Sequence, residues 1–82
     1  FIEGLKDYVI FRLTEGRRLV TRTTVKSLEE ILPGEMFARV NKSNIVNLDA
    51  VESFDSNDVV IGDTEIAIGA GYRYTVIERL LG

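Results

Sequence analysis

The fold of this chain is decided by the stretch Phe37-Ala38-Arg39-Val40-Asn41-Lys42-Ser43-Asn44-Ile45-Val46-Asn47-Leu48. Apolar residues flank a polar centre at positions 41–44. This pattern predicts two short strands, Phe37–Val40 and Ile45–Leu48, joined by a tight, hydrogen-bonding turn. The turn carries one positive charge, that of Lys42.

Further short strands are predicted on both sides of this hairpin, because β-branched and aromatic residues cluster between turn-forming residues. They cover Tyr8–Leu13, Arg18–Thr23, Val51–Phe54, Val59–Ile61 and Thr64–Ile68. The first two are joined by Thr14-Glu15-Gly16, where Gly16 can supply a positive φ.

Two helices are also predicted. The first begins after Thr24, a suitable N-cap, and ends at Pro33-Gly34. Its apolar stripe is expected to consist of Val25, Leu28, Ile31 and Leu32. The second is a short terminal helix at Tyr72–Leu81, expected to pack Tyr72, Val76, Ile77 and Leu80. We therefore predict one mainly β domain over residues 1–82, with antiparallel strands in small packed sheets, a mid-domain helix and a short C-terminal helix.

Composition limits the functions that this chain can have. It has 82 residues, of which 45% are hydrophobic, enough for one core. Cysteine and histidine are absent, which removes disulfides, the usual zinc ligands and the usual general base. Asp55, Asp58 and Asp63 lie in or beside turns, where backbone geometry favours aspartate. We therefore predict that the protein is not an enzyme and needs no cofactor or metal. No apolar run approaches the roughly 18 residues of a membrane span.

Charge is distributed unevenly along the chain. The net charge is −3, which argues mildly against a nucleic-acid partner. Residues 1–48 nevertheless carry +2 and residues 49–82 carry −5. Such a polarised chain can present a basic face despite its acidic total, although ordinary solvated charges explain the distribution equally well.

The central turn has two interpretations from its residues alone. Lys42 offers a mobile charge, Ser43 a hydroxyl that can donate to phosphate, and Asn41 and Asn44 amides that can pair with base edges. Alternatively, this is an asparagine-rich turn whose side chains bind their own backbone. Asn47 is expected to have the structural role, because it lies between two apolar residues.

The central stretch resembles the signature of LytTR DNA-binding domains, in which Phe-x-Arg-Val-His-Arg-Ser-Tyr-Ile-Val-Asn is typical. Three other segments resemble that family in order and spacing. Ile2-Glu3-Gly4-Leu5-Lys6-Asp7-Tyr8-Val9 is similar to its Ile-Glu-x-x-x-x-Tyr-Val opening. The segment from Thr23 to Leu32 is similar to its mid-domain helix, and Ile66–Gly69 followed by Tyr72-Arg73 is similar to its closing strand and terminal helix.

The resemblance implies a cytoplasmic output domain of a bacterial two-component transcriptional regulator. Its implied partners are double-stranded DNA with direct repeats, a second copy in a homodimer on that DNA, an N-terminal receiver domain and a cognate histidine kinase. Loop side chains would enter the major groove and often bend the duplex. The resemblance also implies that this chain lacks the family's first strand, expected before Phe1, and was cut from a longer regulator. That loss would expose a strand edge.

Carried over from the resemblance, Lys42 takes the place of a key base- or phosphate-contacting residue, with Asn41 and Ser43 beside it. Lys6 and Tyr8 fall in or beside the first contacting loop, and Arg73 in the third contact region.

The sequence departs from the family pattern at four places. Asn41 replaces the usual histidine and Asn44 the usual aromatic residue. Asp7 lies in the first contacting loop, and Ala70 or Gly71 stands where a basic residue is expected. Each missing phosphate contact removes roughly 0.9 from the slope of the logarithm of the binding constant against the logarithm of salt concentration, so DNA affinity is expected to be modest. The alternative is therefore a protein-interaction or dimerisation module whose degenerate LytTR-like fold has lost its DNA contacts.

Overall fold

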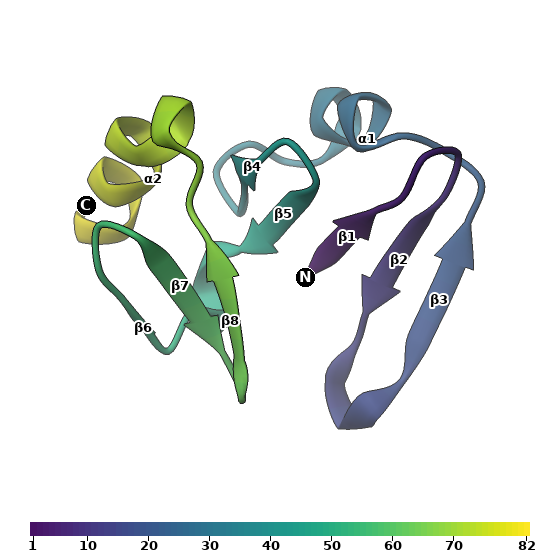
Figure 1. The fold of residues 1–82 in the computed structure, drawn as a ribbon, viewed down its shortest axis with the longest axis horizontal. Helices are drawn as coiled ribbons and strands as arrows, with labels where there is room; N and C mark the ends of the chain where they lie inside the picture. Colours follow the sequence, from purple (N-terminus) through teal and green to yellow (C-terminus); the bar gives the residue numbers. More distant parts are fainter.

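Two antiparallel sheets meet at one hairpin in the computed structural model, which describes residues 1–82 (Figure 1). The larger sheet has the order β3-β2-β1-β5-β4, and the smaller has the order β6-β7-β8. The larger sheet consists of β1 (Ile2–Gly4), β2 (Val9–Arg12), β3 (Arg18–Thr21), β4 (Phe37–Asn41) and β5 (Asn44–Asn47). The smaller one consists of β6 (Ser53–Phe54), β7 (Asp58–Ile61) and β8 (Thr64–Ala67).

The remaining elements are helical. They are α1 (Val25–Ile31), α2 (Arg73–Leu81) and the single 3-10 turns η1 (Thr14–Gly16), η2 (Leu48–Ala50) and η3 (Ala70–Tyr72). A mainly β fold with one mid-domain helix and one C-terminal helix is therefore confirmed. Gly16 has the predicted positive φ, 73°, and its neighbour Glu15 shares that conformation at 63°.

The β4–β5 hairpin anchors both hydrophobic cores, because neighbouring residues of a strand point to opposite faces. Ile45 packs on one face with Ile2, Val9, Val25 and Leu28. Val46 packs on the other face, in a core that includes Val40, Val59, Ile66, Ile68 and Val76. Helix α1 thus closes one face of the larger sheet, while the smaller sheet and α2 close the other (Figure 1).

The helices follow the prediction except at one residue. Thr24 caps α1 by accepting a hydrogen bond from the Ser27 backbone N–H at 3.1 Å. Val25 and Leu28 are buried, but the predicted stripe residue Ile31 is 76% exposed, so its assignment to the core was wrong. Ile31 lies about 100° around the helix axis from Leu32, which takes the last contact with the core instead. In α2, Val76 is buried, and Tyr72, Ile77 and Leu80 pack around it as predicted.

Strand bounds differ from the prediction mainly where strands are short. Ile2–Gly4 forms β1, which lies between β2 and β5 and which residue patterns did not indicate. Three residues are too few to display an alternation, and the pairing partners are distant in sequence. The predicted strand Val51–Phe54 is reduced to Ser53–Phe54, because Leu48–Ala50 turns as η2. The strand expected before Phe1 stays a prediction.

Candidate nucleic-acid interface

The turn between β4 and β5 places Lys42 and Ser43 at its tip, between the paired residues Asn41 and Asn44. Neither tip residue has a positive φ, which excludes the type I′ and II′ turns common in two-residue hairpins. The Asn41 side chain supports the turn instead, because its Oδ1 accepts a hydrogen bond from the Ser43 backbone N–H at 2.8 Å. A shift of strand register between Arg39 and Asn41 accommodates this geometry.

Asparagine side chains also tie the hairpin to its surroundings. Asn41 Nδ2 donates to the Ala67 carbonyl of β8 at 2.7 Å, which links the two sheets. Asn44 Nδ2 donates to the Ile2 carbonyl at 3.3 Å. Asn47 Oδ1 accepts from the Asp49 backbone N–H at 2.9 Å, so the structural role expected for Asn47 is confirmed. Backbone support is therefore a function of all three amides, whatever else Asn41 and Asn44 contact.

Arg39 holds the turn through hydrogen bonds to its backbone carbonyls. Its Nη2 donates to the Lys42 carbonyl at 2.7 Å, and its Nε to the Asn41 carbonyl at 3.3 Å. Nη1 lies 3.1 Å from Glu29 Oε1 on α1, and the guanidinium carbon lies 5.9 Å from the centre of the Tyr72 ring. Residue patterns did not identify this brace. Its one signal was a charge inside an otherwise apolar strand, where a partner is required.

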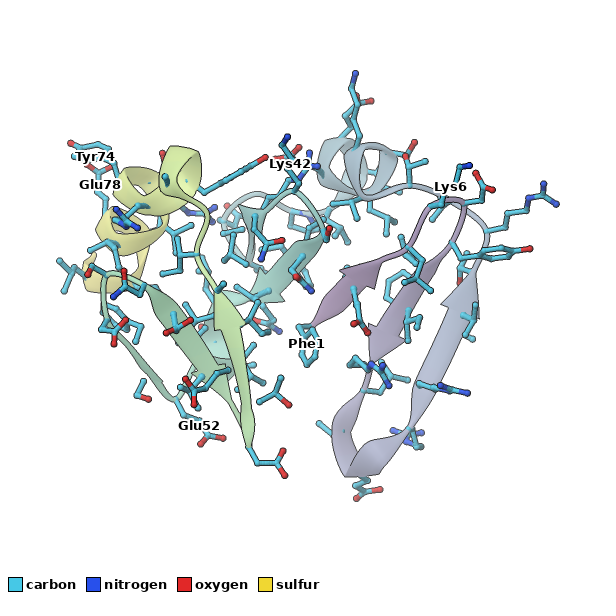
Figure 2. The ribbon with its side chains drawn as sticks, in the orientation of Figure 1. Phe1, Lys6, Lys42, Glu52, Tyr74 and Glu78 are labelled. Carbon is cyan, nitrogen blue, oxygen red and sulfur yellow. The ribbon has the colours of Figure 1, made fainter.

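The two side chains at the tip are free. Lys42 and Ser43 are exposed, and neither side chain has a hydrogen-bond partner within the protein. The structure contains two ion pairs, Arg12 with Glu3 and Arg39 with Glu29, so no carboxylate neutralises Lys42. Figure 2 shows Lys42 reaching away from the ribbon, at the edge of the molecule opposite Glu52. The tip is therefore an accessible cation on a braced backbone.

A hollow of about 420 Å³ lies beside this tip, between the β1–β2 loop, the start of α1 and the β4–β5 turn. Its walls include Lys6, Lys26 and Lys42, which are the only lysines of the chain. We call it the lysine hollow. Arg39 and Ser43 also line it, and the Gly4 backbone N–H donates to the Ser43 carbonyl at 2.6 Å across its floor. Cations around one hollow create a local positive potential that attracts anions.

The structure brings some of the predicted site residues together and leaves others apart. Lys6, Lys42 and Ser43 line the lysine hollow, and Asn41 lies at the base of the turn. Tyr8 is 44% exposed at the end of the β1–β2 loop, outside the hollow. Arg73 is exposed at the start of α2, where its Nε donates to the Ser56 carbonyl at 2.6 Å. Lys26 was not among the predicted contacts.

Other features offer weaker candidates for a site. A larger cleft of about 850 Å³ lies between the two sheets, but its walls carry both Arg12 and Arg17 and the acidic Glu52 and Glu65. Hydrogen bonds from the backbone N–H groups of Asn57 and Asp58 lower the pKa of Asp55, which is a turn-supporting role. No three His, Cys, Asp or Glu side chains are grouped to hold a metal ion. None of the helices has the length and apolarity that crossing a membrane requires.

One comparison with known proteins identifies a family, and another identifies a shared fold. The family model described as the LytTr DNA-binding domain matches residues 1–80. Among solved structures, the LytTr DNA-binding domain of a protein described as a methyl-accepting/DNA response regulator from Bacillus cereus has the same fold, with a TM-score of 0.79. The two sequences are 18% identical, and the match covers 99% of this chain and 78% of that one. No curated protein sequence matches this chain.

Proposed function

This chain belongs to the LytTR family of DNA-binding domains, and from that membership we propose that it is the sequence-specific DNA-binding domain of a bacterial two-component transcriptional regulator. Loop side chains, rather than a recognition helix, would enter the major groove. The observation that carries the proposal is the exposed, unpaired Lys42 on a turn held by Arg39. An accessible cation on a fixed backbone suits a groove contact, because little conformational freedom of the backbone is lost on binding.

The proposed contacts follow the structure of each segment. Lys42 and Ser43 contact bases or phosphates from the β4–β5 turn, and Lys6 and Tyr8 contact the duplex from the β1–β2 loop. Arg73 anchors a phosphate through the guanidinium nitrogens that its bond to Ser56 leaves free. Asn41 reads a base edge with its remaining N–H and oxygen lone pair, since an asparagine amide offers two of each.

The wider context of the proposal comes from the family. We place the domain in the cytoplasm, as the output of a longer regulator with an N-terminal receiver domain and a cognate histidine kinase. It binds double-stranded DNA, with two copies acting as a homodimer on direct repeats.

The test of this proposal is DNA binding by the Lys42→Ala variant. A duplex is first selected from a random library with the unaltered protein, and binding is then measured by fluorescence anisotropy. We expect the substitution to cost roughly 1–3 kcal/mol of binding free energy, because one base or phosphate contact is removed. The far-ultraviolet circular dichroism and melting temperature should not change, since the Lys42 side chain bonds to nothing in the protein.

Arg18→Ala is the matched control, because Arg18 is an exposed cation on β3 that no side-chain hydrogen bond engages. It should bind the selected duplex nearly as well as the unaltered protein does. Equal affinity of the Lys42→Ala variant and the unaltered protein would show that the turn does not contact DNA.

A second candidate function is self-association through β3. This strand is at the edge of the larger sheet, and Leu19 and Val20 are 56% and 52% exposed on its two faces. An unpaired edge with apolar side chains is a template for pairing with another strand. In this alternative the protein is an interaction module that has lost its DNA contacts, and the salt dependence of binding distinguishes the two functions.

A further inference from the structure

We infer that the lysine hollow receives the DNA backbone, and that Lys26 of α1 neutralises one phosphate there, beside the phosphates that Lys6 and Lys42 contact. The inference rests on the proposed function and deepens it in two ways. It adds Lys26, on the second residue of α1, to the proposed contact residues. It also assigns the chemical class of the ligand in the hollow, a phosphate rather than a base.

The charges of the hollow are the first argument. Lys6, Lys26 and Lys42 come from three separate elements, are exposed, and have no carboxylate within 4.0 Å. Of the acidic residues on α1, Glu29 is bound to Arg39, and Glu30 forms no ion pair with a lysine. Three like charges around one hollow repel one another, which is unfavourable for the free protein. A bound anion attracts each of the lysines, and this attraction offsets their mutual repulsion.

Two hydroxyl groups line the hollow, and only one of them is free to donate a hydrogen bond. Thr24 and Ser43 both line the hollow. Thr24 Oγ1 is engaged in capping α1, where it accepts from the Ser27 N–H at 3.1 Å and donates to the Ser27 Oγ at 3.0 Å. The Ser43 hydroxyl has no partner within the protein. It is therefore free to donate to a phosphate oxygen, which accepts strongly from hydroxyl groups.

The floor of the hollow is fixed, so the lysines need not assemble it on binding. The Gly4 N–H bonds to the Ser43 carbonyl at 2.6 Å, which joins the β1–β2 loop to the β4–β5 turn. Val25 of α1 packs so closely on Gly4 that a side chain there would overlap it. Three elements thus meet around one glycine, and the volume of about 420 Å³ leaves room for a phosphodiester with its adjoining sugars.

A phosphate contact has a characteristic thermodynamic effect, which the Lys26→Ala variant tests. Each phosphate contact contributes about 0.9 to the slope of log K against log salt concentration, whatever the base sequence. Anisotropy titrations at several sodium chloride concentrations are made with the selected duplex and with a scrambled duplex. We expect Lys26→Ala to lower the slope by about 0.9 and the affinity at 0.15 M salt by about fivefold, on both duplexes.

Two further variants complete the design. Lys26→Arg should keep the slope, because the charge remains in place. Arg18→Ala, which removes an exposed charge outside the hollow, should also keep it.

An unchanged slope in Lys26→Ala, with a protein that binds its selected duplex, would overturn the phosphate assignment and leave the proposed function standing. A loss confined to the selected duplex would also overturn it, because such a loss indicates base contact. Failure of the unaltered protein to bind any duplex would overturn both the phosphate assignment and the proposed function.

Discussion

Arg39 shows how a single residue sets the position of another. It holds the carbonyls of Asn41 and Lys42 with one planar group and pairs with Glu29 through the same group. The motif placed Arg39 in the signature, but its partners lie on α1 and in the turn, which no local pattern reveals. The position of Lys42 and Ser43 at the tip of a turn was predicted from sequence because turn signals are local, whereas the bonds of Arg39 that support the turn are tertiary.

Arg39→Lys is predicted to destabilise the protein although the charge is kept. A lysine ammonium cannot reproduce the planar fork that bonds two carbonyls and a carboxylate. The Arg39 side chain is 19% exposed, and losing such bonds costs roughly 1.5–3 kcal/mol of unfolding free energy. Urea denaturation measures the loss, and Arg12→Lys is the control, because Arg12 pairs with Glu3 at an exposed position. That control should cost at most about 1 kcal/mol. Equal stability of Arg39→Lys and Arg12→Lys would mean that the bonds of Arg39 do not stabilise the turn.

At the scale of elements, predictability depended on the length of each segment and on where its partners lie. The β4–β5 hairpin was predicted because apolar residues flank one polar turn at positions 41–44. Strand β1 was not, because its three residues become a strand only between β2 and β5. The lysine hollow was not predicted, for the same reason. It forms where β1 ends against α1 and the turn, a junction that separate segments cannot show.

Gly4→Ala is predicted to disturb this junction of three elements. A methyl group at position 4 would overlap the Val25 side chain and lie 3.2 Å from the Ser43 carbonyl. Overpacking of this kind costs typically 1–3 kcal/mol, measurable by urea denaturation. Gly34→Ala is the control, because nothing lies within 4 Å of a methyl group there. Adding Val25→Ala should recover part of the loss by making room. A Gly4→Ala variant as stable as Gly34→Ala would refute the close packing.

At the scale of the whole molecule, the three lysines lie around one hollow, while Arg12 and Arg17 share a cleft with Glu52 and Glu65. Lys6 and Lys42 lie at one edge, while Glu52 lies at the opposite edge (Figure 2). The charge count along the sequence suggested a basic face, but only folding gathers the three lysines, which are 20 and 16 residues apart along the chain. An acidic total charge is therefore compatible with DNA binding, because the approaching duplex meets the basic edge first.

The two candidate functions differ in their response to salt, because one rests on phosphate contacts and the other on apolar contacts. If Lys6, Lys26, Lys42 and Arg73 each neutralise one phosphate, the slope is about −3.6, and affinity falls roughly 150-fold between 50 and 200 mM sodium chloride. Self-association through Leu19 and Val20 on β3 is apolar and should vary little over that range. Anisotropy with the selected duplex and sedimentation equilibrium of the protein alone measure the two processes separately. Leu19→Lys is the control, since it should abolish β3 pairing and leave DNA binding intact. A slope near zero, with a dimer that Leu19→Lys dissociates, would replace the DNA-binding function with the interaction module.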